Sequence, residues 1–131
     1  MQTFKFLTVL FVTMLVVQTN YINENSSDLQ QLIGKWTLDM TPENKEDSNF
    51  AIMTINEVGI NKIEGSFYRE GVIIEEGRTN TQLEVIYVAL VSKDNSGSYN
   101  TTFYLKNEKL YGTTHSIKKN FLSVWVATKE K

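Results

Sequence analysis

The stretch that decides the fold runs from Ser98 to Lys129 and reads SYNTTFYLKNEKLYGTTHSIKKNFLSVWVATK. It contains three β-rich runs, separated by two short connections of turn-forming residues. The predicted strands are Ser98–Lys106, Lys109–Ser116 and Asn120–Lys129. Connections this short cannot hold a crossover helix, so neighbouring strands must run antiparallel. The stretch therefore predicts a β-meander.

The same pattern continues toward the N-terminus. Five further strands are predicted at Ile33–Met40, Phe50–Glu57, Lys62–Arg69, Val72–Thr79 and Gln82–Lys93. Eight antiparallel strands tend to close on themselves, because closure removes the exposed sheet edges. We therefore predict an all-β domain over residues 32–131, an eight-stranded antiparallel up-and-down meander β-barrel.

The first nineteen residues have the layout of a secretory signal peptide. Met1–Lys5 is a short cationic start, and Phe6–Val17 is a run of twelve uncharged, mostly apolar residues. A transmembrane helix needs about 20 apolar residues, so no permanent membrane span is expected. We predict that residues 1–19 are cleaved, that residues 20–31 form a flexible lead-in, and that the mature protein is secreted or periplasmic.

The composition excludes several kinds of chemistry. The 131-residue chain has no cysteine and a single histidine, so it offers no disulfide scaffold, thiolate metal site or thiol nucleophile. Its 13 basic and 15 acidic residues are interspersed, whereas phosphate binding needs clustered cations, so nucleic acid is not an expected partner. No cofactor or metal motif is present. Asn25 and Asn100 begin N-glycosylation patterns, which have meaning only in a host that glycosylates exported proteins.

Catalysis by a triad or a carboxylate pair needs side chains that lie within contact distance of one another. His115 is flanked by Thr114 and Ser116, but adjacent residues on a strand point to opposite faces. Glu75 and Glu76 point apart for the same reason. We therefore predict no catalytic residues and a non-enzymatic protein.

An aromatic-lined barrel interior is itself a candidate binding site for a small, mainly apolar ligand. A one-residue slip in register exchanges the faces of a strand, so Tyr99 and Phe103 are alternatives for the sixth strand. These aromatic side chains could equally fill a solid core, and the chain would then be a protein-interaction module. The predicted ligand wall consists of Trp36, Met40, Phe67, Tyr87, Tyr104, Tyr111 and Trp125.

The fifth predicted strand is apolar on both faces. Such a strand is expected to be covered on both faces, and a barrel has only one interior. We therefore predict that residues 82–93 form an interface between copies of the chain, with cover by the N-terminal segment as the alternative. One face carries Leu83, Val85, Tyr87, Ala89 and Val91, and the other carries Ile86, Val88 and Leu90.

Gly34-Lys35-Trp36 resembles the opening of the first strand in the calycin superfamily, the group of lipocalins, fatty-acid-binding proteins and avidins. The segment Asp28–Ile33 resembles the short 3₁₀ turn that closes one barrel end in that group. The resemblance implies a cationic side chain from the last strand over Trp36, and Lys129 is the candidate.

Among calycins, the avidins are the most similar in length and strand count. The resemblance implies that Ser48 lies near their ligand-binding loop serine and that Trp125 walls the pocket. Leu38 and Phe67 stand where avidins have Asn and Tyr, so two hydrogen bonds to the ureido oxygen of biotin would be missing. The similar segments are Gly34–Thr37, Ile63–Phe67 and Phe121–Val126.

Overall fold

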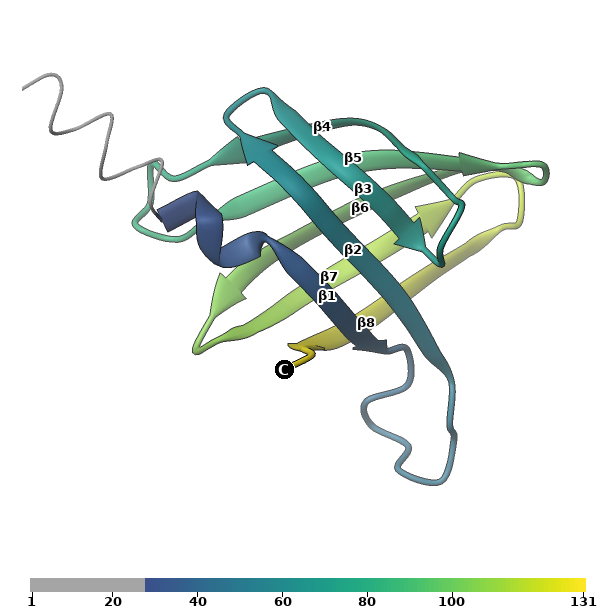
Figure 1. Cartoon of the computed structure of the whole chain (residues 1–131). Coiled ribbons are helices and arrows are strands. Elements are labelled where there is room, and N and C mark those ends of the chain that lie inside the picture. The colour runs from purple at the N-terminus through teal and green to yellow at the C-terminus, as the bar shows by residue number, and fades with distance from the viewer. Residues whose placement is uncertain (1–27) are drawn as a thin grey trace, which may run out of the picture. The chain divides into compact units, whose positions relative to one another are not determined.

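The computed structural model describes residues 28–131, so the predicted signal peptide and most of the predicted lead-in lie outside the described residues. Residues 32–131 form one compact unit, an antiparallel, nearly closed β-barrel of eight strands in up-and-down order (Figure 1). The predicted all-β meander barrel is confirmed. Within residues 28–131, no helix combines the length and apolar character that crossing a bilayer takes.

The strands lie close to the predicted runs, because alternating apolar residues and turn-forming connections mark their limits. A short 3₁₀ turn, η1 (Gln30–Leu32), precedes the first strand. The strands are β1 (Gly34–Asp39), β2 (Phe50–Gly59), β3 (Lys62–Tyr68), β4 (Ile74–Asn80), β5 (Tyr87–Asp94), β6 (Gly97–Lys106), β7 (Lys109–Ser116) and β8 (Phe121–Lys129).

Pairing between the first and last strands closes the barrel. The strand order is β3-β2-β1-β8-β7-β6-β5-β4, which leaves β3 and β4 as the two sheet edges. These edges meet near their ends: Ser66 and Ile73 form an isolated bridge, and the Thr79 N–H donates to the Ile60 carbonyl at 3.0 Å. We call the line between the two edges the β3–β4 seam, and no ladder of paired residues runs along it in the described chain.

Large side chains fill the centre of the barrel. The Trp125 ring packs on Phe67 and Phe103, with ring centroids 6.3 and 5.8 Å apart. Trp36 is 1% exposed, and its Nε1 donates to the Leu32 carbonyl at 2.9 Å. Burying each such side chain contributes about 1.5–3 kcal/mol. The centre is therefore a packed layer, as the solid-core alternative expects.

The fifth strand begins at Tyr87, five residues later than predicted. The Asn80 side chain accepts the Gln82 N–H at 2.9 Å, and Glu84, with φ of 61°, turns the chain. Residues 82–86 are therefore a turn, in which Leu83 is 73% exposed. From Tyr87 onward the strand is apolar on both faces, as predicted.

Candidate functional site

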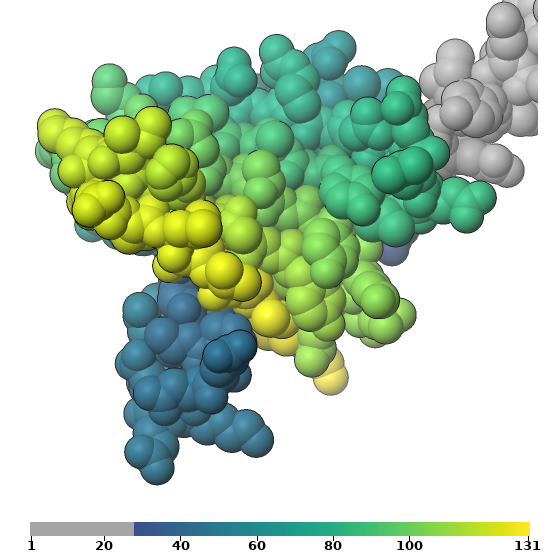
Figure 2. Space-filling model, turned by 180° about the vertical axis from the view of Figure 1, so that it is seen from behind, coloured from purple at the N-terminus to yellow at the C-terminus, as the bar shows by residue number. Residues whose placement is uncertain are grey.

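Four connections gather at one end of the barrel, which we call the mouth: residues 40–49, 69–73, 95–96 and 117–120. In Figure 2 the β1–β2 loop, drawn in blue, projects beside the yellow C-terminal segment. A hollow of about 410 Å³ opens at this end, and we call it the mouth recess. It is lined by Met40, Asn49, Phe50, Ala51, Phe67, Tyr68, Tyr99, Thr114, Lys119, Phe121 and Ser123.

The floor of the mouth recess belongs to the barrel interior. Phe67 is fully buried and Thr114 is 2% exposed. The Thr114 hydroxyl accepts the indole N–H of Trp125 at 3.0 Å and shares a hydrogen bond with Thr101 at 3.1 Å. Because the Thr114 hydroxyl is engaged twice, its position is fixed. It connects the recess to the Trp125 ring.

A carboxylate lies at the mouth next to the recess. Asp94, at the end of β5, accepts hydrogen bonds from the hydroxyls of Tyr68 (3.0 Å) and Tyr99 (2.9 Å) through Oδ2. Its Oδ1 accepts the Ser96 hydroxyl and the Ser96 N–H, both at 2.8 Å. We call Tyr68, Asp94, Ser96 and Tyr99 the Asp94 cluster. It ties β3, β5 and β6 together at the mouth.

These contacts change the acidity of the Asp94 cluster. The Ser96 hydroxyl above all, with the Ser96 N–H and the two phenols, holds the pKa of Asp94 well below its usual range. Burial first, and then the hydrogen bond to Asp94, raises the pKa of Tyr68. Asp94 is therefore a carboxylate and Tyr68 a neutral phenol at neutral pH.

One cation reaches the mouth recess from the β7–β8 turn. The Lys119 Nζ lies over the rings of Tyr99 and Tyr68, 5.2 and 6.0 Å from their centroids. The contact with Tyr99 is the main cause that raises the pKa of Lys119. The backbone N–H of Lys119 donates to the Ser116 hydroxyl at 3.2 Å, which fixes the turn. Lys119 is therefore a positive charge at the edge of the recess.

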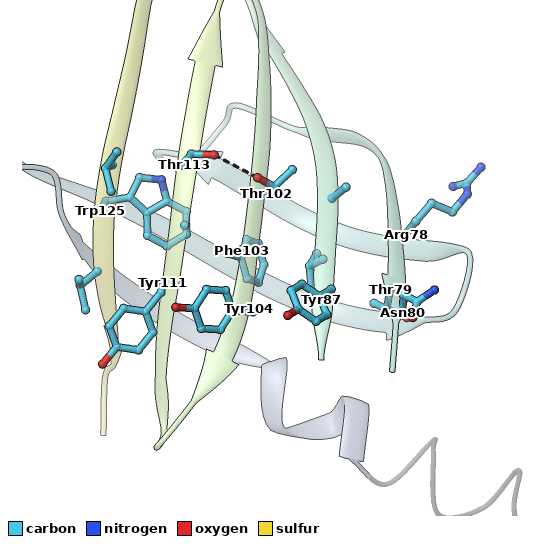
Figure 3. Close-up of a pocket in the computed structure, with 15 residues that line it drawn as sticks. Arg78, Thr79, Asn80, Tyr87, Thr102, Phe103, Tyr104, Tyr111, Thr113 and Trp125 are labelled. Atoms are coloured by element: carbon cyan, nitrogen blue, oxygen red, sulfur yellow. Dashed lines mark hydrogen bonds between the residues drawn. The ribbon is translucent and has the colours of Figure 1, made fainter. Parts of the chain in front are cut away.

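A second hollow lies outside the barrel, over β4–β8, with a volume of about 660 Å³ (Figure 3). Tyr111, Tyr104 and Tyr87 form a row across it, because they are paired residues on three neighbouring strands. Ring centroids in this row are 5.5 and 5.9 Å apart. We call this surface the tyrosine groove.

The predicted ligand wall is thus divided among three places. Met40 and Phe67 line the mouth recess, and Trp125 lies beneath it. Trp36 is buried against Leu32 near the start of β1. The interior position predicted for Tyr87, Tyr104 and Tyr111 is wrong: they lie in the tyrosine groove. On β6 the alternative residues, Tyr99 and Phe103, point inward instead, 2% and 3% exposed. On β6 aromatic residues occur on both faces, Tyr99 and Phe103 on one and Tyr104 on the other, so alternation alone could not decide between them.

The contact implied by the calycin resemblance is present. The Lys129 Nζ lies 5.2 Å from the centre of the Trp36 ring. The two residues are directly paired across β1 and β8.

Sequence reasoning missed the polar part of the mouth. The sequence pattern did not mark Asp94 or Lys119 as site residues, and it did not show that they lie close to Phe50 and Phe121. Each lies at a strand end or in a turn, and only the up-and-down order brings those ends together. They could have been identified from the topology, because every second connection of an up-and-down meander lies at the same end of the barrel.

No protein-family model, curated protein or solved structure gives a significant match to this chain. The fold and the candidate sites therefore rest on the residues and contacts described above.

Proposed function

We propose that this chain is an exported, non-enzymatic binding protein of the calycin type, which holds a small, mainly apolar molecule in its mouth recess. The observation that carries the proposal is the recess itself, a hollow of about 410 Å³ whose floor residues, Phe67 and Thr114, belong to the barrel interior. Concave sites with aromatic walls and a few polar groups are the usual form of small-molecule sites.

The packing of the centre limits where the molecule can bind. Phe67, at the floor of the recess, packs on Trp125, and Trp125 packs on Phe103 further into the barrel. The ligand therefore rests on these rings, between Phe50 on β2 and Phe121 on β8, and does not occupy the full depth of the barrel.

Calorimetric titration of the purified protein with naphthalene carboxamide, a neutral aromatic probe, tests the proposal. We expect saturable binding of one molecule per chain. Ser123→Phe, which places a large ring in the recess from β8, should abolish it. Thr128→Phe is the matched control, because it adds the same ring to an exposed position of the same strand. Failure of both naphthalene carboxamide and naphthalene carboxylate to bind the native chain, or equal binding by Ser123→Phe, would contradict the proposal.

Export is part of the proposal and has its own test. The supporting pattern is the cationic start followed by the apolar run Phe6–Val17. After expression of the full chain in an exporting host, the mass of the exported protein should correspond to cleavage near residue 19. Recovery of the uncleaved chain from the cytoplasm would contradict export.

A second function, self-association, is favoured by the outer face of β5–β8. Tyr87 is 43% exposed, Leu122 65% and Val124 61%, so the tyrosine groove and its surroundings present apolar side chains to solvent. Arg78 is the only charged residue that lines the groove within the described chain. A second copy could therefore pack on this face about a two-fold axis without bringing like charges together across most of it.

Sedimentation velocity at micromolar concentration tests self-association. We expect a dimer for the native chain and a monomer for Val124→Glu, which places a carboxylate in the groove. Ile60→Glu is the control, because Ile60 is 65% exposed at the β2–β3 turn, outside the groove. A monomeric native chain would exclude this second function and leave ligand binding untouched.

A further inference from the structure

We propose that the ligand of the mouth recess carries one anionic group, a carboxylate on a small aromatic or aliphatic body, and that Lys119 binds that group. This inference rests on the proposed ligand-binding function. It begins from charge: among the residues described as lining the recess, Lys119 is the only charged one. A buried or half-buried anion is favourable only where a cation or hydrogen-bond donors can meet it.

Asp94, a carboxylate whose charge acts on Lys119, already has its hydrogen-bond donors. Both oxygens of Asp94 accept two hydrogen bonds each, from Tyr68, Tyr99 and Ser96. No ion pair of 4.0 Å or less joins Lys119 to an acidic residue in the described chain. The Lys119 ammonium can therefore bind an anion without displacing an acidic partner.

The position of Lys119 suits a ligand that lies on the apolar floor. Its ammonium is held over two phenol rings, and those rings are oriented by their hydrogen bonds to Asp94. Phe50, Phe67 and Phe121 supply apolar contacts within the same recess. Asn49 and Ser123 line it as well and can donate to a carboxylate oxygen. The arrangement pairs a cationic edge with an aromatic interior.

A matched pair of probes tests the inference: naphthalene carboxylate and naphthalene carboxamide have nearly the same shape and differ in charge. We expect the native chain to bind the carboxylate more tightly, by roughly three- to tenfold, the range for a partly exposed ion pair with hydrogen bonds. Lys119→Gln should abolish this preference. Lys119 is exposed in a turn, so the variant is expected to fold.

Arg69→Gln is the matched control. The Arg69 guanidinium lies 5.7 Å from the centre of the same Tyr68 ring but does not line the recess, so its loss should leave the preference in place. Equal binding of the two probes by the native chain would overturn the inference and leave the proposed function standing. A preference that survives Lys119→Gln would also overturn it. Failure of both probes to bind would overturn the proposed function together with the inference.

Discussion

At the residue scale, Gly34 in the first strand leaves space for the side chain of Lys129 in the last strand. The φ of Gly34 is +139°, and a Cβ built on it would stand 3.1 Å from the Lys129 Cε. The absent side chain therefore leaves space for the Lys129 stem, and the ammonium reaches the Trp36 ring. In the Gly-x-Trp sequence of the first strand, the glycine thus makes room for the Lys129 side chain, and the tryptophan ring contacts its ammonium group.

Lys129→Met tests this contact, because methionine keeps an apolar stem and removes the charge. We expect the free energy of unfolding to fall by about 0.5–1 kcal/mol, the range for an exposed cation–π contact. Urea unfolding monitored by circular dichroism measures it. Lys106→Met, at an exposed position of β6, should change the free energy less. Equal effects of the two substitutions would show that the Trp36 contact contributes nothing measurable.

Gly112→Ala tests the packing of the central layer. A Cβ at Gly112 would lie 2.6 Å from the Trp125 Cζ2 and 2.6 Å from the Thr102 carbonyl oxygen, so the ring or the backbone must shift. We expect a loss of about 1–3 kcal/mol in unfolding free energy, as for other overpacked cores. Gly59→Ala is the control, since its nearest neighbour would be 4.0 Å away. A stable Gly112→Ala variant with unchanged tryptophan fluorescence would contradict this account.

At the scale of strands and turns, the Asp94 cluster joins β3 to the neighbouring strands β5 and β6, with which β3 forms no ladder. Tyr68 ends β3, Asp94 ends β5 and Tyr99 lies near the start of β6. Since β3 and β5 lie on opposite sides of the β3–β4 seam, the Tyr68–Asp94 hydrogen bond fastens the barrel at its mouth. The contribution of this hydrogen bond to the stability of the barrel depends on pH, because Asp94 must be ionised to accept it fully.

Asp94→Asn tests the fastening. The folded-state pKa of Asp94 is depressed, so its stabilising effect is fully present above the unfolded value of about 3.9 and is lost as the pH falls below it. We expect thermal unfolding of the native chain to shift to lower temperature between pH 7 and pH 3, and by less in Asp94→Asn. Asp47→Asn, in the β1–β2 loop, should keep the native pH response. An unchanged pH response in Asp94→Asn would contradict the role of the cluster.

The strands could be predicted from the sequence. The face that points into the barrel could be predicted for only some of them. β1 has clear alternation, and Trp36 is buried inside the barrel as predicted. On β5–β7 apolar or aromatic residues occupy both faces, and the burial that decides between them comes from the opposite side of the barrel. Of the mouth recess, Met40 and Phe67 were predicted as ligand wall, but Phe50 and Lys119 could not be, because only the closed topology brings them to the same end.

For the barrel as a whole, the β3–β4 seam is where the hydrogen-bond network is interrupted. Seven strand pairs form ladders, two of them with a register shift, while β3 and β4 share an isolated bridge and a few end contacts. Local opening needs less free energy where fewer backbone hydrogen bonds must break. The barrel should therefore open along this seam before any other strand pair separates.

Amide hydrogen exchange tests this order of opening. We expect amides on the facing edges of β3 and β4 to exchange faster than those paired between β6 and β7, because water reaches them without separating a ladder. Phe67 and Thr79 should be slower than the other amides of these edges. Their N–H groups donate across the seam, to the Val72 carbonyl at 2.9 Å and to the Ile60 carbonyl at 3.0 Å. Uniform protection around the barrel would show that the seam is as stable as the ladders and would contradict this order of opening.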